Sequence, residues 1–113
     1  MTFKIELGLG LAAAFALGAG CAALPRVSGE AAARARSRWP DSSFAQLEEG
    51  RATYVRRCAG CHALALPDSR SERQWKAVLD EMAGEAKLTP EERTLVEQFI
   101  FSVRTPAPPG GGS

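Results

Sequence analysis

Five consecutive residues near the middle of the chain, Cys-Ala-Gly-Cys-His at positions 58–62, constrain its structure more than any other stretch. They contain two of the three cysteines and the only histidine of the 113-residue sequence. Two thiols and an imidazole thereby lie within five consecutive residues. A ligand or covalent group that uses all three side chains explains this concentration better than chance does.

The spacing C-x-x-C-H is the attachment sequence of haem c. Two residues between Cys58 and Cys61 allow the short turn that brings both thiols to the two vinyl groups on one edge of the porphyrin. The imidazole of His62, the next residue, then projects at the iron as its proximal ligand. The sequence therefore predicts one covalently bound haem c.

Three other interpretations of the motif leave part of it unexplained. A thioredoxin-like redox pair requires a preceding strand and a βαβ surround, and the sequence shows no strand pattern. A disulfide between Cys58 and Cys61 closes a very small loop and stabilises little. Zinc requires four ligands, which His62 and the cysteines of the mature chain, with Cys21 far away, do not complete.

Composition and charge limit the class of protein. The chain is 45% hydrophobic and 24% charged, which is typical of a small globular domain. Its formal net charge of +1 and the absence of a lysine or arginine run argue against nucleic acid as a partner.

Residues 1–20 have the character of an export signal. The 18 residues from Leu7 to Leu24 carry no charge and follow a short start that contains Lys4. Cys21 ends the stretch LGAGC, which resembles the lipobox of bacterial lipoproteins, although glycine stands where that motif usually has leucine. We expect a periplasmic protein, with Cys21 either lipidated or an ordinary cysteine of a signal or anchor.

The remaining chain is predicted to be all-helical. Residues 21–41 lack a clear apolar face and are expected to form a flexible tether or a loose flanking helix. Residues 42–105 are expected to form the domain, and the proline- and glycine-rich residues 106–113 a disordered tail. Within the domain three helices are predicted to begin at the caps Ser43, Ser71 and Thr89. Their expected apolar faces are Phe44, Leu47, Tyr54 and Val55; Trp75, Val78, Leu79 and Met82; and Leu95, Val96, Phe99, Ile100 and Val103.

Two segments carry a resemblance to a known family. GRATYVRRCAGCHAL, Gly50 to Leu64, resembles the start of a class I cytochrome c domain, and LVEQFIFSVR, Leu95 to Arg104, is similar to its terminal helix. The resemblance covers about sixty residues and implies an all-α, cytochrome c-like fold of about three main helices around one haem. It also implies that Gly50 permits close crossing of the two helices opposite Phe99.

The same resemblance suggests the other axial ligand. Met82, the only methionine after the signal segment, lies 20 positions after His62 on the helix that carries Trp75. This order is similar to that of a short variety of the family, which implies Met82 as the distal iron ligand, whereas core filling is the alternative. The carbonyl of Pro67 is the implied acceptor of the second His62 N–H, with a turn proline as the alternative.

Three aromatic residues complete the expected site. Tyr54 and Trp75 are expected to line the haem or donate to a propionate, or else to pack in the core. Trp39 is expected to cover the haem edge or to attach the tether.

Together these features predict a periplasmic, membrane-anchored monohaem cytochrome that carries electrons between redox partner proteins. Histidine and methionine fill both axial positions, so the iron changes charge without changing ligands. We expect no catalytic residue, although the chain also suits the haem subunit of a larger oxidoreductase. A haem-based sensor or small-gas binder is the alternative if Met82 does not ligate. A peroxidase-like enzyme needs distal acid–base groups that the sequence does not show.

Overall fold

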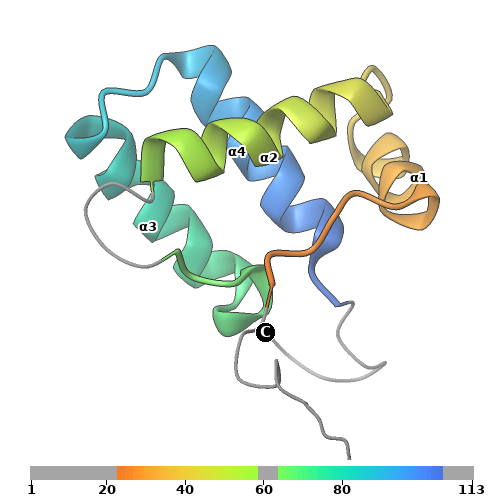
Figure 1. Ribbon diagram of the computed structural model, residues 1–113, viewed down its shortest axis with the longest axis horizontal. Coiled ribbons are helices and arrows are strands. Elements are labelled where there is room, and N and C mark those ends of the chain that lie inside the picture. Colours follow the sequence, from red (N-terminus) through yellow and green to blue (C-terminus); the bar gives the residue numbers. More distant parts are fainter. Residues whose placement is uncertain (1–22, 59–63, 106–113) are drawn as a thin grey trace, which may run out of the picture.

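The computed structural model describes residues 23–58 and 64–105. In this part of the chain there are four α-helices, a short 3-10 turn and no strand, which confirms the predicted all-α class. The elements are α1 (Gly29–Arg38), α2 (Phe44–Cys58), the turn η1 (Pro67–Ser69), α3 (Glu72–Glu85) and α4 (Pro90–Val103). Figure 1 shows α2 crossing α4, with α1 and α3 on opposite sides of this pair.

The three helices predicted from the sequence begin at the expected caps. In each helix, the hydroxyl of the cap accepts the backbone N–H of the residue three positions later. The side chain of that later residue accepts the backbone N–H of the cap, and all these bonds measure 2.9–3.1 Å. The pairs are Ser43 with Gln46, Ser71 with Gln74, and Thr89 with Glu92. These reciprocal bonds satisfy donors that would otherwise lack a partner.

The core lies where α2, α3 and α4 meet. Its largest fully buried side chains include Leu47, Trp75, Leu79, Val96, Phe99 and Ile100. The prediction was wrong for two residues of α2, since Phe44 is 46% and Val55 is 41% exposed. Val55 follows the buried Tyr54 by about 100° around the helix, which turns it toward solvent.

Gly50 is the point of closest approach between α2 and α4. A Cβ atom built on Gly50 would lie 2.9 Å from Phe99 Cβ and 2.8 Å from the carbonyl carbon of Leu95, and would overlap the Leu95 oxygen. The expected crossing of these helices at Gly50 opposite Phe99 is therefore confirmed. Only a residue without a side chain allows the two backbones to touch in this way.

The segment 21–41 requires a correction, because residues 29–38 form a packed helix and not a flexible tether. Ser28 caps α1 by accepting the Ala31 N–H, and Ala31, Ala32 and Ala35 are buried in the core. The Arg34 guanidinium donates to the Ser102 carbonyl of α4 over 2.7 Å. Small alanines allow α1 to lie close to α4, and they give no strong apolar signal in the sequence. Residues 1–22 and 106–113, including Cys21, lie outside the described part of the chain.

Replacement of Gly50 by alanine is expected to lower the free energy of unfolding by about 2 kcal/mol or more, because the backbone of Leu95 cannot move away without separating α2 from α4. Gly84→Ala in α3 is the matched control, since a Cβ there meets no atom within 4 Å. It should raise stability by about 0.5–1 kcal/mol. Denaturant unfolding followed by circular dichroism measures both. Equal effects of the two changes would contradict the crossing.

Candidate functional site

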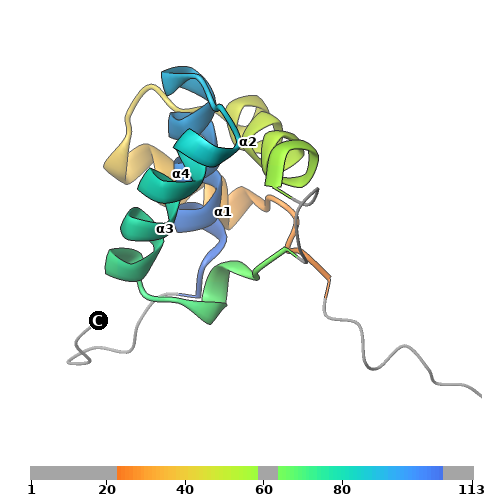
Figure 2. The same cartoon turned by 90° about the vertical axis from the view of Figure 1, so that its left-hand side faces the viewer.

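A cavity of about 290 Å³ lies between the end of α2, the segment 64–70 and α3. Figure 2 shows this segment leading into the beginning of α3. The lining is mainly apolar and aromatic: Tyr54, Cys58, Leu64, Ala65, Arg70, Trp75, Val78, Leu79, Glu81, Met82 and Glu85. The cavity thus brings together four of the site residues that the sequence predicted, Tyr54, Cys58, Trp75 and Met82.

Cys58 is the last residue of α2 and is buried in the cavity wall at 4% exposure. Leu64, the next described residue, lines the same cavity. The chain between them contains Cys61 and His62, which lie outside the described residues. The described residues that flank this stretch, Cys58 and Leu64, thus both line the cavity.

Met82 reaches the cavity from α3. Trp75 and Leu79 are the fully buried residues of this helix, and Val78 and Met82 are partly buried at the edge of the same face. Positions 75, 78, 79 and 82 repeat at helical spacing, so the predicted stripe holds and its last members line the cavity. The thioether of Met82 and the thiol of Cys58 are therefore lining groups of one site, 24 positions apart in the sequence.

Tyr54 forms the floor between the cavity and the core. Its hydroxyl donates to the Ala65 carbonyl over 2.6 Å, and its ring meets Trp75 edge to face at 6.2 Å between centroids. Burial raises the pKa of Tyr54 to about 12, and a negative charge on Cys58, present only where that thiol is not bonded to another group, adds to the shift. The phenol thus stays protonated and bound to the segment that follows the motif.

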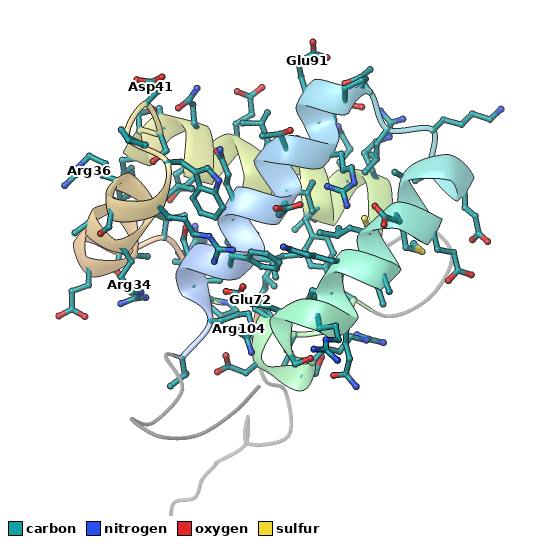
Figure 3. All side chains as sticks on the ribbon, turned by 180° about the vertical axis from the view of Figure 1, so that it is seen from behind. Arg34, Arg36, Asp41, Glu72, Glu91 and Arg104 are labelled. Carbon is teal, nitrogen blue, oxygen red and sulfur yellow. The ribbon has the colours of Figure 1, made fainter. Side chains whose placement is uncertain are left out.

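Trp75 and Pro67 are joined to each other. The indole N–H of Trp75 donates to the Pro67 carbonyl over 2.8 Å, and Arg104 Nε donates to the same oxygen over 3.2 Å. Figure 3 shows Arg104 at the end of α4, beside the start of α3. The Pro67 carbonyl thus accepts from Trp75 and shares the Arg104 donor with the Arg70 carbonyl, and its implied role as acceptor for His62 stays a prediction because His62 lies outside the described residues. Pro67 is buried and does not line the cavity.

The donors of Tyr54 and Trp75 are likewise committed to backbone carbonyls. Both rings are buried in the core, as the packing alternative predicted, and both also line the cavity, whereas donation to a carboxylate of a ligand has no support from these contacts. A charged group that the sequence did not single out is Arg70, whose guanidinium lies 5.2 Å from the Trp75 ring and lines the cavity. A single arginine in a turn carries no periodic signal, so its position requires the folded chain.

Trp39 belongs to a different part of the surface. It caps the end of α1, where the Arg38 guanidinium stacks 4.9 Å from its ring. It lines a second, more polar hollow of about 720 Å³, with Asp41 and Glu91 among the lining residues (Figure 3). The two hollows share no residue. Trp39 thus attaches the N-terminal segment to the domain, and the alternative of a cover for the first cavity is not supported.

The described residues contain neither a cluster of metal ligands nor a membrane-spanning helix. Within residues 23–58 and 64–105, no three histidine, cysteine, aspartate or glutamate residues are grouped so as to hold a metal ion. No helix in that part of the chain is long and apolar enough to cross a membrane. Comparison with family models, with curated proteins and with solved structures gave no match to the chain.

The raised pKa of Tyr54 predicts a specific dependence on pH. Between about pH 10 and pH 12 the unfolded chain loses the phenol proton while the folded protein keeps it, so the free energy of unfolding falls as pH rises through this window. Tyr54→Phe should lack this part of the pH dependence. Tyr54 is the only tyrosine, so the ultraviolet tyrosinate band, taken as the difference from Tyr54→Phe, titrates this group alone. A midpoint near 10 would show that the hydroxyl is solvated.

Proposed function

We propose that the cavity holds one covalently attached haem c and that the protein is a class I-like monohaem cytochrome that carries electrons. One observation carries the proposal. Cys58, the first thiol of the attachment motif, and Met82, the implied distal ligand, line the same apolar cavity although they come from different helices. A motif that matched by chance would not be expected to place its first thiol in the wall of a cavity that a thioether also lines.

The described residues fit a porphyrin. The walls are formed by aromatic and aliphatic side chains, with charge limited to Arg70, Glu81 and Glu85. A volume of about 290 Å³ is near the lower end of ligand sites, which span roughly 300–1,000 Å³. Sulfur groups and aromatic rings suit a flat, apolar macrocycle with a soft metal centre. They do not suit a hydrated ion.

Each described residue then has a defined task. Cys58 and, from the motif, Cys61 hold the haem by thioether bonds, and His62 binds the iron. Met82 supplies the sixth ligand, while Tyr54 and Trp75 exclude water from one side of the cavity. Arg70 offers a positive charge to a haem carboxylate. When bound, haem supplies reversible one-electron exchange at an iron whose axial positions are filled, and methionine raises its reduction potential.

The helical framework supports the same assignment. The close crossing of α2 and α4 at Gly50 and Phe99 is the feature implied by the resemblance to the class I domain. It fixes the end of α2, and hence Cys58, relative to the core. The haem would complete the wall that Leu79 and Tyr54 now form, and so add apolar area to a small core.

The proposed location is the periplasm, with the domain held at the membrane through Cys21 or an uncleaved N-terminal segment. Arg51 donates to the carbonyls of Pro25 and Leu24 over 2.9 and 3.1 Å, which attaches the chain to α2 at a point three positions after Cys21 in the sequence. Such a short connection keeps the domain close to its anchor. Redox proteins at the same membrane are the proposed partners, either as separate donors and acceptors or as subunits of a larger oxidoreductase.

A haem-based sensor is the second candidate, and one observation favours it. From Asp80 to Thr89 no residue is fully buried, so the end of α3 that carries Met82 is held weakly compared with Trp75 and Leu79. If Met82 leaves the iron readily, the sixth position accepts an external ligand. Carrier and sensor therefore differ in how firmly Met82 is held.

Covalent attachment is tested by the cysteines. In cells that possess a haem-ligation apparatus, the wild-type protein should gain the mass of one haem, and a Cys58→Ser, Cys61→Ser double variant should retain none after denaturation. Cys21→Ser is the matched control, because it removes a thiol outside the motif and should keep the haem. Intact retention in the double variant, seen by mass spectrometry, would overturn the attachment.

Ligation by Met82 is tested by Met82→Leu, which keeps an apolar side chain of similar volume. The ferric protein should lose its methionine–iron absorption band completely, and its reduction potential should fall. Val78→Leu, one turn earlier on the same cavity wall, is the control and should keep the band. A band unchanged in Met82→Leu would reject this ligand.

A further inference from the structure

We propose that Arg57 regulates the sixth-ligand position by clamping the end of α3, which carries Met82, against the end of α2, which carries Cys58. This inference rests on the proposed function, since it concerns the same haem site. Arg57 acts here as a positioning residue and does not line the cavity. Its guanidinium determines the fraction of molecules in which Met82 is bound to the iron.

The contacts of Arg57 join three elements. One guanidinium nitrogen donates to the carbonyls of Ala86 and Lys87 over 2.8 and 2.9 Å, and the other lies 3.2 Å from a Glu92 carboxylate oxygen. Ala86 is the C-cap of α3, which ends at Glu85, Lys87 is the residue after that cap, and Glu92 is in the first turn of α4. A cation placed at the carbonyl end of a helix also opposes the negative pole of the helix dipole.

The clamped turn is the one that follows Met82. The Ala86 N–H donates to the Met82 carbonyl over 2.7 Å, and the Leu88 N–H donates to the Ala83 carbonyl over 2.9 Å. These bonds and that of the Lys87 N–H to Gly84 form a Schellman motif. A displacement of the turn therefore displaces the backbone of Met82.

The turn is intrinsically weak for two reasons. Lys87 has a φ of 58°, a left-handed conformation that glycine adopts readily and that a residue with a Cβ does not. No side chain from residue 80 to residue 89 is fully buried, and Met82 and Leu88 are only partly buried, so apolar packing holds this end of α3 less firmly than the part that carries Trp75 and Leu79. Another ion pair nearby joins Arg93 to Asp80. The Asp80 side chain is 74% exposed, so this pair contributes little to the stability of the turn.

Arg57 supplies the missing attachment. Hydrogen bonds from a charged donor are stronger than neutral ones, and two of the three acceptors here are the carbonyls at the weak end itself. Without the guanidinium, the last turn of α3 opens more often and Met82 withdraws from the cavity. Arg57, the residue before the attachment motif, therefore sets the equilibrium between the state with Met82 bound to the iron and the state with Met82 detached.

Arg57→Gln in the haem-loaded protein tests this, with Arg56→Gln as the matched control. Arg56 is the adjacent arginine, is exposed, and among the described residues donates only to Thr53 over 3.5 Å. Added imidazole binds ferric iron by displacing methionine, so its apparent affinity follows the fraction of protein with Met82 detached. We expect that affinity to rise about tenfold in Arg57→Gln and to stay at the wild-type value in Arg56→Gln.

Amide hydrogen exchange gives a readout that does not depend on the iron. The amides of Ala86 and Leu88 should exchange faster in Arg57→Gln, while those of the buried part of α4 should not change. Lys87→Gly relieves the left-handed strain and should have the opposite effect, with lower imidazole affinity and slower exchange. If Arg57→Gln does not retain haem, Arg57→Lys takes its place. Its imidazole affinity is expected to exceed that of the wild type by less than about tenfold.

The outcomes separate the two proposals. Unchanged imidazole affinity and exchange in the Arg57 variant, in a protein that binds haem and shows the methionine–iron band, overturn the clamp and leave the proposed function intact. A wild-type protein that takes up no haem overturns the proposed function, and the clamp with it. Haem without the methionine–iron band overturns the ligand assignment and the clamp, and leaves the attachment of haem standing.

Discussion

The contact between the backbones of α2 and α4 at Gly50 is the constraint on which the rest of the fold depends. Because no side chain separates the helices there, Phe99 lies directly against α2 and the core closes around this crossing. The direction of α2 is thereby fixed, and so is the position of Cys58 two turns later. Helix α3 then completes the cavity by packing Trp75 and Leu79 on the same core.

Polar contacts, together with the packing of Leu64, Ala65 and Pro67 on the core, position the rest of the site. The segment after residue 64 has few buried side chains, and it is held by donors from three sides: Tyr54 to Ala65, Trp75 to Pro67, and Arg104 to Pro67 and Arg70. The hydroxyl and backbone N–H of Thr105 both donate to Asp68, which lowers the pKa of that carboxyl. Without these donors the backbone carbonyls would be unpaired acceptors near the core, whereas the Asp68 carboxylate is exposed to solvent. A rigid loop at this place defines one wall of the cavity.

Some features of the fold were predictable because their signals are local. A capping box is a pair of residues three positions apart, so the starts of α2, α3 and α4 could be predicted from the sequence. The apolar face from Trp75 to Met82 could be predicted from helical spacing. Gly50 required a family resemblance, since a glycine in a helix does not by itself predict a crossing. The packing of α1 was missed because its contact face consists of alanines, which bury well but carry little hydrophobic signal.

The errors at the site have a common physical origin. The partners of the Pro67 carbonyl could not be predicted, because the donors that reach a carbonyl depend on the fold, which here brings Trp75 and Arg104 to it. Arg57 and Arg70 were missed for the same reason, as arginines gain their role from distant partners. Cys61, His62 and Cys21 lie outside the described residues, so their roles stay predictions.

The central claim is that this chain forms two thioether bonds to one haem. The most direct measurement is the absorption spectrum of the purified wild-type protein, denatured in alkaline pyridine and reduced, after expression beside a working haem-ligation apparatus. The account predicts the spectrum of a haem with both vinyl groups saturated, at one haem per chain. A colourless protein, or a haem that is extracted by acidified organic solvent, would contradict it.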